Sequence, residues 1–429
     1  MLNLPRWSTL ALPVALVLLL VGAPLTLAQA ELEEDFDRVA EGTAAIRELP
    51  LAGEIVESFQ TQAELAADLP AQIDEEYPVE EAEGDARAWA AFGLIPPGTD
   101  LRRLYTDLLA EQVAGYYDPE TDEMVIVTGS GFDALAEYTY SHEVVHALQD
   151  QHLGLDELLD GTAARTDDAA LAVTSLYEGD AMAASTEYLF FDPALAARMA
   201  GSLLTAAPET PLLDAAPPVL VLWFLFPYLA GQPFVEAVRA DGGWAAVDAA
   251  YADPPASSEQ ILHPEKYLEG EAPLAVALPD LAPTLGEGWA VIDENVVGEL
   301  QTAAILADLE PGQGLSRVTG GLDLPEAATD AAAGWGGDRY ALWTAGDREV
   351  LVWRSAWDSE EEAAEFAGAL RAREETRFGG AFEGESAEAL AMEAADRAAR
   401  LERSGVDVTY VLATDPDLAD QTLAALRAG

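Results

Sequence analysis

Apolar residues recur at three- and four-residue spacing through much of the chain, and this pattern is typical of amphipathic helices. We predict that Glu31 to Ala110 is mainly helical, with a break at residues 94–100. A helix is predicted from Leu101 to Gln112, with Asp100 as its N-cap. In the segment VAGYYDPETDEMVIV, two short apolar stretches flank turn-forming residues, which predicts a β-hairpin.

Further helices are predicted in the middle of the chain. Residues Asp156 to Asp168 are polar and are predicted to form a loop, followed by a helix from about Ala169 to Phe190. The apolar run from Val219 to Ala230 is too short to cross ~30 Å of hydrocarbon. We therefore predict a buried core helix there, kinked or ended at Pro227.

From about Val276 the pattern changes to alternating strand-like and helical segments. Strands are predicted at Arg339–Ala345, Glu349–Trp357 and Val406–Leu412, and helices at Ser359–Arg373 and from Leu418. We therefore predict the α+β class, with a mainly helical domain of residues 31–275 that contains a small hairpin sheet, and a small α+β domain of residues 276–429 with an antiparallel sheet. Inhibition, substrate binding and scaffolding all stay open as roles of the second domain.

The N-terminus has the pattern of an export signal. An apolar stretch from Leu10 to Leu20 is followed by the small-residue triplet Ala28-Gln29-Ala30. Cleavage after this triplet would make residues 1–30 a signal peptide and place the protein outside the cytoplasmic membrane, either secreted or in the cell envelope. An uncleaved membrane anchor is the alternative, because the apolar run continues almost to the triplet.

The composition narrows the classes of partner and of metal site. With 78 acidic and 21 basic residues the formal net charge is −57, which argues against nucleic acid and against an anionic membrane surface. This acidity is compatible with adaptation to high salt and with a compositional bias of the genome. The chain has no cysteine, so a zinc site would have to use nitrogen and oxygen ligands.

The strongest chemical signal is the segment HEVVH at residues 142–146. Two histidines four residues apart on a helix lie roughly 6 Å apart along its axis and about 40° apart around it, so both imidazoles can reach one ion. Glu143 lies about 100° from His142, where it can address water at that ion without becoming a ligand. Asp133 and Gly154 are suited to begin and end this helix. A chance match is the alternative, but three of the four histidines lie in this one helix.

Glu178 is the candidate for a third ligand. It is the only charged residue on one face of the predicted helix that follows, among small and apolar side chains. A buried carboxylate is costly unless it is paired or bound to a metal ion, and two histidines that need a third ligand supply such a reason. An ion pair with Arg165, or exposure of this face at the surface, is the structural alternative.

Six segments of the chain together resemble a family of exported bacterial proteins that are identified as zinc metallopeptidases: GYYDPETDEMVIV, HEVVHALQDQH, LYEGDA, FPYLAGQPFV, SSEQILHPEKYL and AAAGWGGDRYALW. These proteins are similar to the gluzincins, the thermolysin-like branch in which a glutamate on the next helix completes the zinc site. The resemblance covers nearly all of the mature chain. It implies that His142, His146 and Glu178 bind Zn²⁺ and that Glu143 is the general base.

The chain departs from two zinc-peptidase patterns. Thermolysin-type enzymes carry a supporting aspartate four residues after the third ligand, where this chain has Met182, and Asp180 projects about 200° from Glu178 on a straight helix. His152 reproduces the ligand spacing of the metzincins, which would make it a rival to Glu178. Gln149 replaces the metzincin glycine, however, and on an unbroken helix His152 would lie about 15 Å along the axis from the first histidine.

A group that stabilises the oxyanion is also expected opposite the metal ion in an enzyme of this class. His263, the one histidine outside the main helix, is our candidate, and Tyr267 and Tyr116 are alternatives. The sequence therefore predicts an exported zinc metallopeptidase that acts on a peptide or protein substrate. The competing hypotheses are a catalytically inactive envelope scaffold that keeps the zinc site, and an enzyme that hydrolyses a non-peptide amide.

Overall fold

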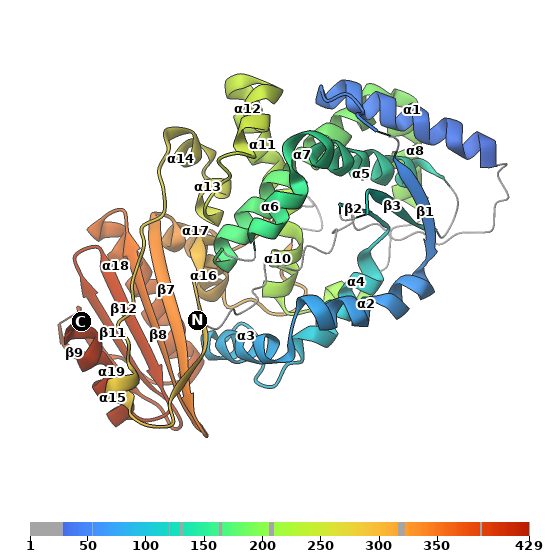
Figure 1. Cartoon of the computed structure of the whole chain (residues 1–429). Helices are drawn as coiled ribbons and strands as arrows, with labels where there is room; N and C mark the ends of the chain where they lie inside the picture. The colour runs from blue at the N-terminus through green and yellow to red at the C-terminus, as the bar shows by residue number, and fades with distance from the viewer. Residues whose placement is uncertain are drawn as a thin grey trace.

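The structure is a computed structural model that describes residues 29–428 apart from 54, 120, 129–131, 163–164, 206–209, 316–321 and 387. Residues 1–28, which hold most of the predicted signal peptide, lie outside the described residues. A mainly helical part and a sheet-rich C-terminal part lie side by side (Figure 1). The predicted α+β class is therefore confirmed.

The helical part contains most of the helices of the described chain. They are α1 (Gln29–Arg47), α2 (Gln62–Glu76), α3 (Val79–Phe92), α4 (Leu101–Gln112), α5 (Ala134–Leu153), α6 (Leu155–Thr162), α7 (Asp167–Phe191), α8 (Pro193–Thr205), α9 (Pro211–Ala215), α10 (Pro218–Leu229), α11 (Gly231–Gly242), α12 (Trp244–Ala250), α13 (Ser258–Leu262) and α14 (Pro264–Glu269). The next helix, α15 (Ala282–Leu285), packs on the sheet-rich part. The predicted α4 is confirmed in both bounds, and its N-cap Asp100 accepts a hydrogen bond from the Arg103 N–H.

A small sheet lies against α5. Its strands β1 (Val56–Thr61), β2 (Gly115–Asp118) and β3 (Glu123–Thr128) have the order β1-β3-β2, with β2 antiparallel and β1 parallel to β3. The predicted hairpin is confirmed, and so is the mainly helical character of residues 31–110, in which β1 is a short strand that was not predicted. The Val127 N–H donates to the Ala114 carbonyl oxygen, so these two residues form a hydrogen-bonded pair of the ladder. Hydrogen-bonded and non-hydrogen-bonded pairs alternate along an antiparallel ladder, and the backbone N–H and C=O groups of Gly115 and Tyr117 therefore point away from β3. On this side β2 is an edge strand.

One helix prediction needs correction. The predicted loop at residues 156–168 contains α6, because Leu155, Leu158 and Leu159 pack into a core cluster shared with α7 and α11. The helix that begins at Pro218 ends at Leu229, two residues after Pro227, so the proline lies in its last turn. The predicted burial of this helix is confirmed.

Helices α10 and α11 follow one another and pack closely against α7. Together Pro218–Gly242 are long and apolar enough for a membrane span, the one such stretch among the described residues, but 67% of the apolar window is buried inside the protein. A Cβ atom at Gly231 would lie 2.2 Å from the Ser175 carbonyl oxygen, and one at Gly179 would lie 2.2 Å from the Gly231 backbone. The two glycines therefore permit a backbone approach beside Glu178 that no larger residue would allow.

The C-terminal part is built on a seven-stranded sheet in which every neighbouring pair is antiparallel, with the order β4-β7-β8-β12-β11-β10-β9. Its strands are β4 (Ala290–Asn295), β7 (Trp335–Ala345), β8 (Arg348–Trp357), β9 (Glu383–Ser386), β10 (Ala389–Glu393), β11 (Ala398–Ser404) and β12 (Asp407–Ala413); a separate pair is formed by β5 (Gly314–Leu315) and β6 (Leu322–Asp323). The helices here are α16 (Gly298–Ala307), α17 (Glu326–Ala332), α18 (Glu360–Phe378) and α19 (Pro416–Ala428). The strands predicted as β7, β8 and β12 and the helices predicted as α18 and α19 are confirmed, while the strands β4, β5, β6, β9, β10 and β11 were not predicted.

Alternating side chains of this sheet form two cores. Leu351 and Trp353 of β8 pack with Phe366 of α18 on one face. Val350 and Val352 pack on the other face, in a cluster that includes Leu418 and Leu423 of α19. Successive side chains of a strand point to opposite faces of the sheet, and here both sets are apolar. Both faces of the sheet are therefore covered by helices.

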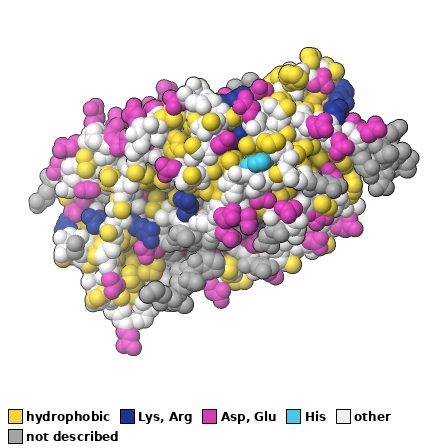
Figure 2. All heavy atoms as spheres, turned by 45° about the horizontal axis from the view of Figure 1, so that its top comes forward, with side chains coloured by type: hydrophobic (Ala, Val, Ile, Leu, Met, Phe, Trp, Pro, Cys, Tyr) yellow, Lys and Arg dark blue, Asp and Glu magenta, His cyan; other side chains and the backbone are white. Residues whose placement is uncertain are grey.

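Acidic side chains cover much of the face shown in Figure 2, whereas lysine and arginine gather at a few places. This distribution follows from the formal net charge of −57. Like charges on one surface repel one another, and dissolved salt screens that repulsion. Measurements of stability on this protein therefore need a fixed ionic strength.

Two buried carboxylates lie close to Gly298, at the boundary between the helical part and the sheet-rich part. Asp168 on α7 accepts a hydrogen bond from the Ser258 N–H at 3.1 Å, and Asp338 on β7 accepts from the Val297 and Gly298 N–H groups, each at 2.9 Å. Burial raises the pKa of Asp168 to about 8 and that of Asp338 to about 6. Both groups are thus protonated over a wider pH range in the folded protein than in the unfolded chain.

We expect Asp168 and Asp338 to make the metal-free protein lose stability as the pH rises from about 4 to about 8. A raised folded-state pKa contributes stability that is complete below the unfolded-state value of about 4 and is lost as the pH passes the folded-state value. Thermal unfolding with a chelator at constant ionic strength measures this loss. Asp168→Asn cannot ionise, so its melting temperature should fall less steeply above pH 6; parallel curves for the variant and the wild type would contradict the assignment.

Candidate metal centre

The helix α5 is set in place by its own ends and by its neighbours. Asp133 caps its first turn by accepting hydrogen bonds from the Leu135 and Ala136 N–H groups, and Gly154 ends it with a φ of +70°. Both predicted ends are confirmed. The side chains from residue 137 to 149 are buried all around the helix, not on one face alone. α5 contacts β2, α1, α7 and α8 and is the central helix of this part of the protein.

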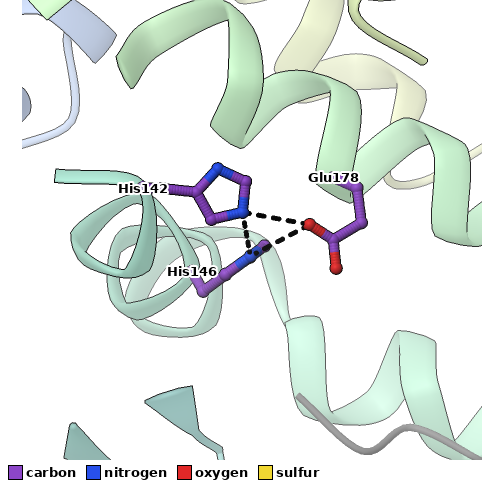
Figure 3. A group of neighbouring side chains, drawn as sticks. All are labelled: His142, His146 and Glu178. Atoms are coloured by element: carbon purple, nitrogen blue, oxygen red, sulfur yellow. Dashed lines mark hydrogen bonds and ion pairs between the residues drawn. The ribbon is translucent and has the colours of Figure 1, made fainter. Parts of the chain in front are cut away.

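Three predicted ligand atoms converge between α5 and α7 (Figure 3). His142 Nε2 lies 3.1 Å from Glu178 Oε2, and His146 Nε2 lies 3.4 Å from the same oxygen. The two imidazole Nε2 atoms are 3.2 Å apart. The exposed fractions of these three residues are 0%, 6% and 1%, so the group is buried. The structure therefore brings together a His/His/Glu triad that is able to hold a metal ion.

The distances within the triad can be compared with those of a tetrahedral site. Zinc–nitrogen and zinc–oxygen bonds of about 2.0–2.2 Å place tetrahedral ligand atoms about 3.3–3.6 Å from one another. The observed separations of 3.1, 3.2 and 3.4 Å lie close to this range. Nitrogen and carboxylate oxygen suit Zn²⁺ and also other divalent transition-metal ions. The residues present thus fit such an ion, while its identity as zinc is a proposal.

The electrostatics of the triad favour a positive charge at its centre. Burial opposes protonation of His146, but the Glu178 carboxylate outweighs burial and raises the pKa of His146 to about 9. Burial would raise the pKa of Glu178, but the two imidazoles, His146 foremost, hold it below its ordinary value. Burial lowers the pKa of His142. Without a metal ion the triad therefore keeps an ionised carboxylate and binds a proton, and a metal ion would supply the same positive charge.

Gln149 fixes which nitrogen of His146 faces the triad. The His146 Nδ1–H group donates to Gln149 Oε1 at 2.8 Å, and Gln149 Nε2 donates to the Tyr177 carbonyl oxygen at 2.9 Å. The second bond orients the amide, so its oxygen faces the imidazole and leaves Nε2 for the ion. Asp180, for which the sequence supported no role, accepts from Gln149 Nε2 at 3.2 Å and does not contact a ligand directly.

Glu143 lies beside the triad, as the HExxH spacing predicted. Its Oε2 atom accepts a hydrogen bond from the Tyr117 N–H at 3.2 Å, so the edge of β2 orients the carboxylate. Its Oε1 atom is buried and has no hydrogen-bond partner among the described residues. Burial, assisted by Glu178, raises the pKa of Glu143 to about 8. A carboxylate held in this way is suited to accept a proton near neutral pH.

Tyr228 on α10 is a neighbour of the triad that the sequence analysis missed. Its ring centre lies 6.0 Å from that of His142, its side chain is buried, and its hydroxyl group interacts with the Glu178 carboxylate. Burial and the carboxylates of Glu178 and Glu143 raise its pKa well above the ordinary value. The only signal in the sequence was the motif FPYLAGQPFV, which contains Tyr228 but suggested no role for it.

The other candidates have partners elsewhere. His263 Nε2 is 2.9 Å from Glu299 Oε1, and the Tyr267 hydroxyl donates to the Asp253 carbonyl oxygen. Tyr116 packs against a different core cluster. Among the described residues, no hydrogen bond joins any of the three candidate oxyanion donors to the triad.

His152 is also separate from the triad. It is exposed, and its Nε2 atom contacts the Pro50 carbonyl oxygen at 2.5 Å. The third member of the buried metal-binding group is Glu178. The geometry thus favours Glu178 over His152 as the third ligand.

A second acidic group in the described part of the chain already contains a cation of its own. Glu259, Glu271 and Asp358 lie close enough together to hold a metal ion, but the Lys266 ammonium lies 2.6–2.8 Å from all three carboxylates. Two of the three are exposed. This group is an ion-pair cluster that links the helical part to β8–α18, and we assign no metal to it.

The comparisons with known proteins reach only the C-terminal part. Residues 288–423 match a family model described as a domain of unknown function (DUF8575). The match starts after the metal centre and covers less than half of the chain. Neither the curated proteins nor the solved structures contain a match.

Proposed function

We propose that the protein is an exported zinc metallopeptidase with a gluzincin-like catalytic core. The observation that carries the proposal is the convergence of His142, His146 and Glu178, from two helices, next to the oriented carboxylate of Glu143. A site that only stabilises the fold has no need of a base beside the metal ion. The export part of the proposal rests on the sequence of residues 1–30.

The residues around the triad have distinct roles in this proposal. A bound Zn²⁺ ion would act as a Lewis acid that activates water and polarises the scissile carbonyl group. Glu143 accepts the proton of the attacking water and delivers it to the leaving amine. The Tyr228 hydroxyl group, and not His263, is placed to donate a hydrogen bond where negative charge develops on the substrate.

The edge of β2 is the proposed docking site for the substrate backbone. The outward N–H and C=O groups of Gly115 and Tyr117 lie on the side of the strand that faces Glu143. An extended peptide can add to such an edge as a further strand. Pairing there would use the Tyr117 N–H group, so substrate binding would release Glu143 from its hydrogen bond and free the carboxylate for proton transfer.

One observation favours the scaffold alternative. All four residues, the triad and Glu143, are at most 6% exposed, so substrate can reach them only after neighbouring elements move. Closed sites are typical of structural zinc, whereas catalytic zinc keeps an open position. An inactive envelope protein that retains the site is therefore the second candidate function.

Metal analysis combined with a cleavage assay tests the proposal. We expect about one zinc ion per purified chain, and we expect cleavage of a broad peptide library that a chelator abolishes and added Zn²⁺ restores. The assay is repeated at several salt concentrations, because the acidic surface makes stability dependent on ionic strength. A zinc-loaded protein that cleaves nothing in the library would favour the scaffold function.

A further inference from the structure

A chain of buried polar contacts leads from the triad to the N-terminal helix. It starts at His146, whose Nδ1–H group donates to Gln149, and continues through the Gln149 amide to Asp180 Oδ2 at 3.2 Å. Gln149 and Asp180 are each 0% exposed. The orientation of the His146 imidazole depends on the orientation of the Gln149 amide. That amide in turn is held by the groups that accept its hydrogen bonds.

Asp180 is held by an arginine that lies far away in the sequence. Arg47 Nε donates to Asp180 Oδ1 at 2.6 Å and a second guanidinium nitrogen donates to Oδ2 at 3.1 Å, in a two-point contact. The Tyr251 hydroxyl group also donates to Oδ2 at 2.8 Å. Arg47 is 0% exposed and lies over the ring of Trp244. The planar guanidinium fork fixes both oxygens of Asp180, which a lysine could not do.

Arg47 is the last residue of α1, whose other contacts are mainly apolar. Phe36, Val39, Ala40 and Ala44 pack α1 against α5 and its neighbours. Arg47 is therefore the point at which α1 joins the polar network of the metal centre. No residue of α1 belongs to the triad or touches it through a hydrogen bond between described residues.

From this geometry we infer that Arg47 is a positioning residue for the ligand His146, and that the docking of α1 and the binding of metal are thermodynamically coupled. The inference rests on the proposed metal site but not on peptide hydrolysis. Without Arg47, Asp180 would be a buried charge without its main partner and would move. Gln149 would then lose one of its two fixed acceptors and keep only the Tyr177 carbonyl oxygen, so the imidazole would be held less firmly.

The coupling works in both directions. If a docked α1 raises the affinity for metal, bound metal must stabilise the docked position of α1 by the same factor. A metal-loaded protein should therefore protect the last turn of α1 from amide hydrogen exchange better than the metal-free protein does. A partner or protease that displaces α1 would in turn release the ion.

The test compares zinc affinity in three full-length variants by equilibrium competition with a chromophoric chelator. Arg47→Met removes the fork, Arg47→Lys keeps the charge and loses the two-point contact, and Val39→Ala weakens the apolar docking of α1 without touching the network. Changes to groups that orient a ligand cost about 10- to 100-fold in metal affinity. We expect a loss of this size in Arg47→Met, a smaller loss in Arg47→Lys, and an affinity near that of the wild type in folded Val39→Ala.

A second readout separates positioning from general destabilisation. With Co²⁺ in place of zinc, the visible spectrum reports ligand geometry and should change in Arg47→Lys but not in Val39→Ala. If Arg47→Met does not fold, the affinity and spectrum of Arg47→Lys decide the matter. Wild-type affinity in both arginine variants would overturn this inference alone, whereas a wild-type protein that binds no metal would overturn the proposed metal site as well.

Discussion

Replacing Glu143 with glutamine should lower peptide hydrolysis by about 10²- to 10⁴-fold, the usual contribution of a general base, while the metal stays bound. The amide keeps the shape of the side chain, and its oxygen can still accept the hydrogen bond from the Tyr117 N–H group that orients the carboxylate. It cannot accept a proton in the transition state. The loss should therefore appear in kcat, with little change in zinc content or melting temperature.

Steady-state kinetics on any library peptide that the wild type cleaves, together with metal analysis of both proteins, measures this effect. Tyr228→Phe is a useful companion variant, because it removes a hydroxyl group from the same site but leaves the base. If zinc-loaded wild type were no faster than Glu143→Gln, the triad would be a fold-stabilising metal site. Equal activity in the two proteins would thus exclude the proposed enzyme.

Replacing Glu178 with alanine should cost more than 100-fold in zinc affinity. Removing a group that only orients a ligand costs about 10- to 100-fold in metal affinity. Glu178→Ala should cost more, because it removes a charged ligand itself and leaves only the two buried imidazoles to bind the ion. At a metal concentration of 100 times Kd, binding stabilises the wild type by about 2.7 kcal/mol. The variant should lose this stabilisation, so added zinc should no longer raise its melting temperature.

The matched control is His152→Ala, on the same helix as the two histidine ligands but exposed and bonded to the Pro50 carbonyl oxygen. Zinc stoichiometry in this variant should stay near one. Glu178→Gln serves as a second variant in case the alanine substitution disturbs the packing of α7. A zinc site emptied by His152→Ala, with Glu178→Ala still loaded, would contradict the ligand assignment.

Local signals explain the parts of the structure that could be predicted. Asp100 and Asp133 begin α4 and α5 because a carboxylate accepts from the first free N–H groups of a helix, an interaction within three residues. The ligand set was also accessible, because HExxH places two ligands on one helical face and Glu178 was the single charge on a stripe of the next helix. These features need no knowledge of the distant chain.

Features that depend on distant partners could not be predicted in the same way. The strands β10 and β11 are rich in alanine, glutamate and arginine, which favour helices, and they are strands because β12 supplies a template. Tyr228 reaches the triad only because Gly231 lets the α10–α11 junction approach α7. His263 was proposed as a donor for its rarity, but its partner is Glu299.

The burial of the triad has a consequence for how fast metal enters and leaves. An ion can exchange only during brief openings of the surrounding helices, because the ligands are at most 6% exposed in the closed state. The opening frequency, and not the concentration of a competing chelator, then limits the rate of removal. Such a centre has a long residence time whatever its equilibrium affinity. A freshly synthesised chain would accordingly acquire its ion most easily while α1, α5 and α7 are still coming together.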